Sequence, residues 1–226
     1  MTVKAVLIDI DNTILDFTKS ADKAIKICAG KSGLTLPENY LETFLQVNDR
    51  LWGLLEQRKI KKQDIYDRRW TEIFTALRID RDGRKFEEEF RSTIRDVAIP
   101  VDGAEEILRY LSSKYPVYCA SNASRERQEH RLSLNGFDKF ISGLFISEDI
   151  GFQKPAKEFF DACKAALYPV MPEETVMIGD SLSADIAGAR NAGIQSIWFN
   201  IKKESSEKYE ASLISVNHLS EIKNII

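Results

Sequence analysis

The stretch that decides the fold is Val6–Thr13, which reads VLIDIDNT. Its first three residues are apolar, which is typical of a buried strand in a sheet covered on both faces. Asp9 and Asp11 then stand where this strand ends, and open α/β sheets bind ligands outside the carboxyl ends of their strands. Two carboxylates one residue apart are costly to leave unpaired, and carboxylate oxygens suit Mg²⁺. Taken alone, Asp-x-Asp also fits a turn or a helix cap.

Length and composition set the broad class. The chain has 226 residues, 43% of them hydrophobic, which fits one α/β core with a sizeable insertion. A net charge of −3 gives the molecule no basic character, so we expect no nucleic-acid polymer as a partner. The start MTVKAVLIDIDN is interrupted by charge, and no apolar stretch approaches the roughly 20 residues of a membrane span. We therefore expect neither a signal peptide nor a membrane partner.

The cysteines and histidines indicate the redox compartment and limit the kinds of metal site and catalysis that we expect. Cys28, Cys119 and Cys163 lie far apart and form no Cys-x-x-Cys motif, which indicates a reducing compartment and a cytoplasmic protein. His130 and His218 have no partner at metal-ligand spacing. We therefore expect neither a zinc site nor histidine-based catalysis.

The region after the first strand predicts helices alone. The candidates span residues 21–30, 37–55, 63–77 and 84–97, and Pro37 suits the first turn of the second one. A block this long exceeds an ordinary crossover between strands. We therefore expect residues 17–97 to form an inserted all-helical domain, and residues 1–16 with 98–226 to form the core.

The rest of the chain alternates helices with short apolar strands. Helices are predicted over 103–113, 125–134, 156–166 and 184–192, and strands over 117–120, 143–147, 175–178 and 195–199. This alternation predicts an α/β fold with a Rossmann-like, doubly wound parallel sheet. Residues 211–216 fit an edge strand, and residues 202–210 fit a polar loop.

Each predicted strand delivers polar groups at its carboxyl end. Beyond the first aspartate pair, these groups are Ser121, Asn122, Lys154, Asp180 and Asp185. Carboxylates, a hydroxyl, an amide and one ammonium together suit a phosphoryl group with Mg²⁺.

The chemistry of these side chains suggests a division of roles. Asp9 is the better-placed nucleophile, and Asp11 is placed to protonate a leaving oxygen and later to activate water. Ser121, the backbone after it at Asn122, and Lys154 can bind phosphate oxygens.

The fourth strand end supplies the remaining groups. Asp180 would complete the metal site, while Asp185 would bind the metal through water or orient Lys154. Singly, these signals also fit ordinary features, because Ser-Asn is a common helix cap, Lys-Pro a common loop and Gly-Asp-Ser a common turn. Their order along the chain and their positions at strand ends favour a functional site.

Four motifs stand in the same order as in a known superfamily. They are Asp9–Thr13 (DIDNT), Ser121-Asn122, Lys154-Pro155 and Gly179–Asp185 (GDSLSAD). This pattern resembles the haloacid dehalogenase superfamily of phosphohydrolases. The resemblance implies an aspartyl-phosphate on Asp9 and Mg²⁺ bound by Asp9, Asp180 and the backbone carbonyl of Asp11, with Thr13 in support. The helical insertion resembles the family's cap, which closes over the substrate.

The branches of the superfamily can be weighed. Haloacid dehalogenases proper lack the second aspartate of the first motif, so Asp11 disfavours dehalogenation. Phosphoglucomutase-type phosphotransferases share the core and the cap position and stay open as an alternative. A non-catalytic member is disfavoured, because every charged motif group is present.

Within the phosphatases, several stretches look closest to the pyrimidine 5′-nucleotidase-like branch, and N-acylneuraminate-9-phosphatase-like enzymes are the alternative. The stretches are Asp9–Phe17, Asn48–Trp52, Lys59-Ile60, Arg68–Trp70 and Gly179–Asn200. The resemblance implies a small phosphorylated metabolite such as a nucleoside 5′-monophosphate as the substrate, and a monomer or homodimer.

Four side chains of the helical insertion have two interpretations each. Trp52 and Trp70 fit helix packing better than base stacking. Arg68 and Arg69 fit solvated or ion-paired side chains better than substrate ligands.

Overall fold

The computed structural model describes residues 2–203 and 213–226, and the chain divides into two compact units. The core unit comprises Met1–Asp16 and Ile99–Ile226, and the helical unit comprises Phe17–Ala98. The boundary predicted from the sequence falls one residue earlier, between positions 97 and 98.

A six-stranded parallel sheet forms the centre of the core unit. Its strands are β1 (Ala5–Ile8), β2 (Val117–Ser121), β3 (Gly143–Ile146), β4 (Thr175–Gly179), β5 (Gln195–Phe199) and β6 (Ile214–Val216). Their spatial order is β3-β2-β1-β4-β5-β6, so Val6 of β1 pairs with Val117 on one side and Val176 on the other. The direction of winding reverses between β1 and β4, which is where such sheets bind ligands. The predicted Rossmann-like α/β fold is confirmed.

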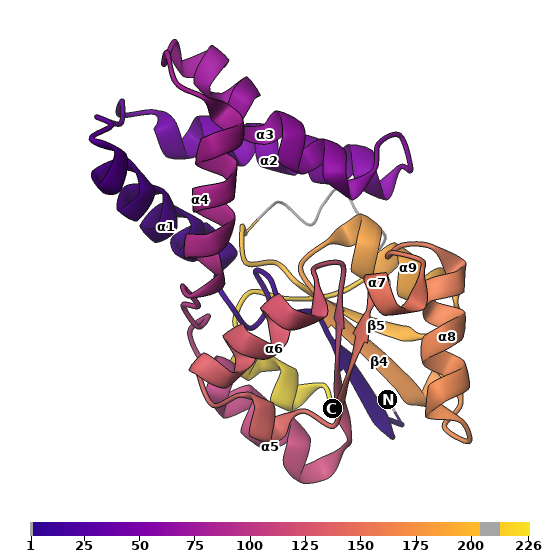
Figure 1. Ribbon diagram of the computed structural model, residues 1–226. Helices are drawn as coiled ribbons and strands as arrows, with labels where there is room; N and C mark the ends of the chain where they lie inside the picture. Colours follow the sequence, from indigo (N-terminus) through magenta and orange to yellow (C-terminus); the bar gives the residue numbers. More distant parts are fainter. Residues whose placement is uncertain (1, 204–212) are drawn as a thin grey trace. The chain divides into compact units, whose positions relative to one another are not determined.

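Helices cover both faces of this sheet. They are α5 (Ala104–Lys114), α6 (Arg125–Leu134), α7 (Ser147–Ile150), α8 (Lys157–Leu167) and α9 (Gly188–Asn191). Short 3₁₀ segments are η1 (Asp138–Phe140), η2 (Pro172–Glu174) and η5 (Leu219–Asn224). Figure 1 places α8 and α9 on one side of the strands and α5 and α6 on the other. Because both faces are covered, the four apolar residues of β1 are completely buried.

Three details of the core unit differ from the sequence-based expectation. Ser147 begins the short helix α7 instead of ending the third strand. The helix predicted over 184–192 is a π-helical segment, η3 (Leu182–Ala187), followed by the short helix α9. The predicted edge strand over 211–216 is found as β6, which begins at Ile214, while residues 204–212 of the loop and the strand lie outside the described residues.

The helical unit packs around aromatic side chains. Its helices are α1 (Phe17–Ser32), α2 (Tyr40–Glu56), α3 (Lys62–Leu77) and α4 (Gly83–Arg95). Helix α1 is longer at both ends than predicted, and Pro37 precedes α2 in a turn, in which Tyr40 N donates to Pro37 O at 3.1 Å. At Gly83 a Cβ atom would lie 2.4 Å from the backbone nitrogen of Thr71, so only glycine permits this approach of α4 to α3.

The two residues Arg69 and Trp70 of α3 belong to the interior of the helical unit. The Trp70 ring lies 4.3 Å from that of Phe86 and 5.4 Å from that of Phe90, centroid to centroid. Arg69 is 4% exposed, and its Nε and Nη2 donate to both carboxylate oxygens of Glu87. The preference for helix packing and ion pairing over substrate contact at these two positions agrees with these contacts.

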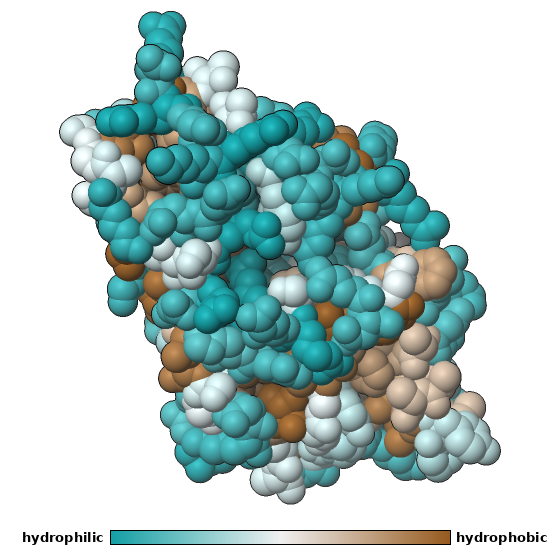
Figure 2. Space-filling model, viewed as in Figure 1, coloured by the Kyte–Doolittle hydropathy of each residue, from teal (hydrophilic) through white to brown (hydrophobic). Residues whose placement is uncertain are grey.

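The exterior is dominated by polar and charged groups. Figure 2 shows hydrophilic residues over most of the visible face, as expected of a chain with 30% charged residues. Within the described residues, no helix combines the length and the apolar character needed to cross a membrane. The cysteines Cys28, Cys119 and Cys163 are free thiols and all buried.

Candidate active site

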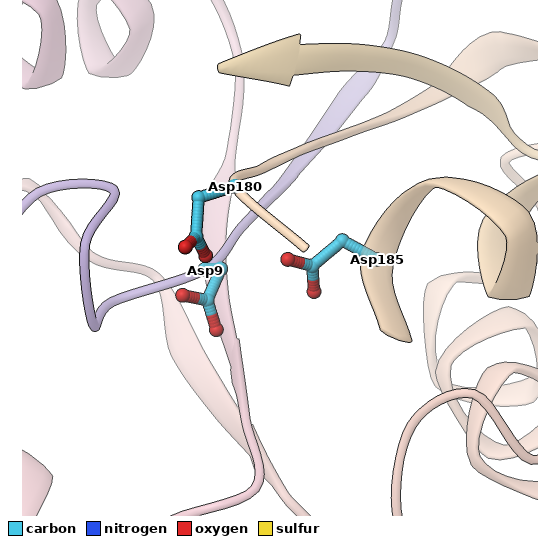
Figure 3. A group of neighbouring side chains, drawn as sticks. All are labelled: Asp9, Asp180 and Asp185. Atoms are coloured by element: carbon cyan, nitrogen blue, oxygen red, sulfur yellow. The ribbon is translucent and has the colours of Figure 1, made fainter. Parts of the chain in front are cut away.

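The candidate site lies at the carboxyl ends of β1 and β4, next to the point where the winding of the sheet reverses. Ile8 pairs with Ile178, and Asp9 N donates to Ile178 O at 2.8 Å, so Asp9 and Asp180 leave adjacent strands together. Asp185 reaches the same point from η3 (Figure 3). One carboxylate oxygen from each of these three residues lies within 4.8 Å of the other two.

A single buried lysine holds this group together. Lys154 Nζ donates to Asp9 Oδ1 at 2.7 Å, to Asp185 Oδ1 at 2.6 Å and to the backbone oxygen of Ala120 at 2.6 Å. These three bonds use every proton of the ammonium group. Burial lowers the pKa of Lys154, but the carboxylates of Asp185 and Asp9 outweigh it and raise that pKa well above its usual range, so the lysine stays charged.

The carboxylates outnumber the positive charge among them. Burial raises the pKa of Asp9 to about 7, because the attraction of Lys154 does not outweigh the combined effect of burial and of repulsion from Asp185. The pKa of Asp180 is also raised, first by burial and then by the charges of Asp9 and Asp185. A group that concentrates negative charge in this way favours a bound cation, and its oxygen ligands fit a hard divalent ion.

Two local features of the β4 end place Asp185. A Cβ atom on Gly179 would lie 2.2 Å from Asp185 Oδ2, so the carboxylate occupies space that only glycine leaves open. Ser181 N donates to that oxygen at 3.1 Å, while the other oxygen accepts from Lys154. This geometry agrees with the predicted orientation of Lys154 by Asp185.

The side chain of Asp11 is directed elsewhere. Its Oδ1 accepts from Arg131 Nη1 at 2.6 Å, and its Oδ2 accepts from Gln128 Nε2 at 2.8 Å. Partial burial alone would raise the pKa of Asp11, but the charges of Arg131 and Arg127 outweigh it and hold that pKa at about 2. The Asp11 carboxylate therefore lies outside the group of three carboxylates. Its backbone carbonyl is the ligand that the resemblance implies.

The end of β2 contributes Ser121 and Asn122. Ser121 Oγ accepts from Gln128 Nε2 at 2.9 Å and from Ala123 N at 3.1 Å. The Asn122 amide accepts from Lys154 N at 2.9 Å and donates to Lys154 O at 3.0 Å. Asn122 thus fixes the loop that carries the central lysine. Thr13 Oγ1 donates to Asp9 Oδ2 at 3.4 Å.

Comparison with known proteins decides the family. The model of the haloacid dehalogenase-like hydrolases matches residues 3–193. The chain belongs to this family. Pyrimidine 5′-nucleotidase PynA from Streptococcus pneumoniae is 32% identical over 201 residues, which cover 88% of this chain and 85% of the relative. N-acylneuraminate-9-phosphatase from Mus musculus is 26% identical, with 88% of this chain and 83% of the relative covered.

A solved structure of the family agrees with the fold along the whole chain. The HAD-hydrolase YfnB from Bacillus subtilis, in a crystal form bound to magnesium, has a TM-score of 0.91 and 27% identity. The match covers 100% of this chain and 99% of that one. This hydrolase therefore shares its fold with a family member that has been seen with magnesium.

Sequence reasoning missed two residues of the hydrolase's site, Gln128 and Arg131. Both are completely buried and both contact Asp11, yet they stand in a helix of ten mostly polar residues. Their spacing of three residues puts them on one face of that helix. The same spacing also occurs on solvent-exposed helix faces. Only the contact with Asp11, after the end of β1, shows that this face of the helix is buried.

Proposed function

We propose that this hydrolase is a Mg²⁺-dependent phosphomonoesterase that carries the phosphoryl group on Asp9 during turnover. The observation that carries the proposal is the group of three carboxylates around one buried lysine at the carboxyl ends of β1 and β4. A nucleophile, a cation site and a positive charge for phosphate oxygens are thereby gathered within a few ångströms.

The donor set fits the metal that the family implies. Asp9 and Asp180 would hold Mg²⁺ through carboxylate oxygens and Asp11 through its backbone carbonyl, with Asp185 acting through water. When bound, the ion would offset the repulsion between the Asp9 carboxylate and the phosphoryl group of the substrate.

The chain's own residues account for the covalent steps. A carboxylate oxygen of Asp9 attacks phosphorus, the bond from phosphorus to the substrate's ester oxygen breaks, and Asp11 gives that oxygen a proton. Water then attacks the phosphoryl group on Asp9 and passes a proton to Asp11, which releases inorganic phosphate. Because the Asp11 carboxylate pairs with Arg131 in the structure, its acid role requires the carboxylate to turn toward the substrate and take up a proton.

Phosphate oxygens would be bound from the opposite side of the site. The Ser121 hydroxyl and the backbone after it are the donors available there, and the Lys154 ammonium adds its positive charge. We infer that the Asn122 side chain serves this binding indirectly, by holding the backbone of Lys154 in place.

We propose a small phosphorylated metabolite as the substrate, with a pyrimidine nucleoside 5′-monophosphate as the first candidate. The activity named for the relative PynA supports this choice. The relative named as an N-acylneuraminate-9-phosphatase makes a sugar phosphate the second candidate.

Release of phosphate from p-nitrophenyl phosphate tests the reaction. We expect turnover with Mg²⁺, none with excess chelator, and a loss of at least about 1,000-fold in Asp9→Asn with the melting temperature retained. Asp161→Asn, which changes an exposed aspartate of α8, is the matched control. Near-full activity of Asp9→Asn would refute the assignment of the nucleophile.

A substrate panel tests the specificity. Nucleoside monophosphates, sugar phosphates and three-carbon phosphates are compared by kcat/KM. Preference for UMP, dUMP or dTMP supports the nucleotidase, and preference for a sugar phosphate supports the second candidate. Formation of a 6-phosphate from a hexose 1-phosphate and its bisphosphate, without free phosphate, would instead indicate a mutase.

A further inference from the structure

One face of α6 is directed at the two polar groups that flank the nucleophile. Gln128 and Arg131 stand three residues apart on this helix, and neither side chain is exposed. Gln128 Nε2 donates to Ser121 Oγ at 2.9 Å and to Asp11 Oδ2 at 2.8 Å. A single amide group thus joins the end of β2 to the end of β1.

Arg131 fixes which way the Gln128 amide faces. Arg131 Nη1 donates to Gln128 Oε1 at 3.0 Å and to Asp11 Oδ1 at 2.6 Å. If the amide were turned over, its NH₂ group would face the arginine donor and its oxygen would face the Asp11 carboxylate, and both contacts would be repulsive. The amide therefore has one allowed orientation, with its two protons toward Asp11 and Ser121.

This orientation determines which hydrogen bonds the Ser121 hydroxyl can still make. A hydroxyl oxygen accepts two hydrogen bonds and donates one. Both acceptor positions of Ser121 Oγ are filled, one by Gln128 Nε2 and one by Ala123 N. Among the described residues no acceptor takes the remaining proton, so the hydroxyl can act toward a ligand only as a donor.

The buried arginine makes its side-chain hydrogen bonds through one nitrogen. In the described part of the chain, Nε and Nη2 of Arg131 lack hydrogen-bond partners although they are buried. The hydrogen bonds of this guanidinium are therefore concentrated on one nitrogen. All of its contacts to other polar groups pass through Nη1, which serves Gln128 and Asp11.

We propose that Gln128, oriented by Arg131, is a positioning residue that commits the Ser121 hydroxyl to donating a hydrogen bond to the phosphoryl group. This inference rests on the proposed function, because it needs a phosphoryl oxygen opposite Ser121. Gln128 contacts neither Asp9 nor the substrate in this scheme, and it acts on the phosphoryl group through the serine.

A double-mutant cycle tests the coupling between the two residues. The four proteins are the wild type, Gln128→Met, Ser121→Ala and the double variant, and methionine keeps the side-chain length while removing both donors. The readouts are kcat/KM for p-nitrophenyl phosphate and the dissociation constant of inorganic phosphate, both with Mg²⁺. This ester has a good leaving group that needs little protonation, so an effect of Gln128 through Asp11 contributes little.

We expect Gln128→Met to lower kcat/KM and to weaken phosphate binding about tenfold in the wild-type background. In the Ser121→Ala background the same change should cost less than about twofold, because the group on which Gln128 acts is gone. Gln195→Met is the matched control, since Gln195 begins β5 at the opposite end of the sheet. Melting temperatures establish that all variants fold.

Each alternative outcome decides a different point. If the two losses multiply in the double variant, Gln128 acts independently of Ser121 and the inference is overturned. If the wild type binds phosphate without hydrolysing the ester, the proposed function fails, and the phosphate affinities alone decide the positioning role. If the wild type with Mg²⁺ does not bind phosphate, Ser121 has no anion to bind and the positioning role is overturned as well.

Discussion

The core unit and the helical unit each bury charged side chains, but they balance them differently. In the helical unit one guanidinium, Arg69, meets one carboxylate, Glu87, and its Nη1 donates to Asn48 at 3.0 Å. In the core unit one ammonium, Lys154, faces two carboxylates directly, with the third, Asp180, beside them. The balanced pair needs nothing further, whereas the unbalanced group is ready to accept a cation.

The surroundings reinforce this difference. The Arg69 guanidinium lies 5.0 Å from the ring centroid of Phe90 and 5.8 Å from that of Phe44, so aromatic faces cover the charge. The Asp9 carboxylate shares the ammonium of Lys154 with Asp185, so burial and the repulsion between the carboxylates raise the pKa values of Asp9 and Asp180. Of these two groups of buried charges, the one with uncompensated charge is the one at the candidate site.

The largest effect is expected when the lysine of the unbalanced group is removed. Lys154→Met deletes the positive charge between Asp9 and Asp185, so we expect kcat to fall about 1,000-fold. Steady-state hydrolysis of p-nitrophenyl phosphate measures it. Lys157→Met, in the exposed first turn of α8, is the control and should keep wild-type activity. A Lys154→Met protein within tenfold of the wild type would contradict the role of the lysine.

Breaking the balanced pair should act on stability. Arg69→Met leaves the Glu87 carboxylate buried without its partner, and we expect a loss of about 3 kcal/mol in the free energy of unfolding. Urea unfolding followed by circular dichroism measures this loss. Replacing both partners, as in Arg69→Met with Glu87→Leu, should recover most of it, and a double variant no more stable than the single one would contradict the interpretation.

Supplying a cation should stabilise the core unit. At Mg²⁺ concentrations near 100 times its dissociation constant, linkage predicts a gain of about 2.7 kcal/mol and a higher melting temperature. Asp180→Asn should lose most of this gain, while Asp161→Asn should keep it. A gain of equal size in all three proteins would place the ion elsewhere.

The gain from Mg²⁺ should depend on pH in a defined direction. The pKa of Asp9 is about 7 in the fold and near 3.8 when unfolded, so the metal-free fold is favoured by protonation and loses stability as the pH rises from about 4 to 7. Protons and Mg²⁺ compete for the same carboxylate, so the rise in melting temperature should be greater at pH 8 than at pH 5.5. Melting curves with metal and with chelator at both pH values measure it, and a greater rise at pH 5.5 would contradict it.

The smallest effect is expected one residue from Arg69. Arg68 pairs with Glu72 on the surface at 2.9 Å, and its side chain is 42% exposed. Arg68→Met should therefore change the free energy of unfolding by less than about 0.5 kcal/mol. Comparison with Arg69→Met under identical urea conditions shows whether burial, and not charge, separates the two arginines.

Much of the core unit could be predicted from the sequence, because its strands and their ends are indicated by patterns of neighbouring residues. A short apolar run followed by a polar group identifies a strand and its carboxyl end, and parallel strands bring those ends together. Asp9, Asp180 and Asp185 were found in this way, and the structure brings them within reach of one ion. The deviation at η3 arose because a π-helical turn and an α-helix share nearly the same apolar spacing.

The rest depends on contacts between distant segments. Nothing in the sequence near Arg69 distinguishes it from Arg68, since only the packing of α4 brings Glu87 against it. Gln128 likewise lies 117 positions from Asp11 along the chain, so their hydrogen bond leaves no trace in local periodicity. Side-chain direction, unlike strand placement, is decided by tertiary structure.

The central position of β1 has a consequence for protein synthesis. The nucleophile candidate leaves the ribosome well before Lys154 and Asp185, which complete its surroundings and follow 145 and 176 positions later. Any chain truncated before Asp185 lacks part of the group of three carboxylates, so this group is complete only late in synthesis.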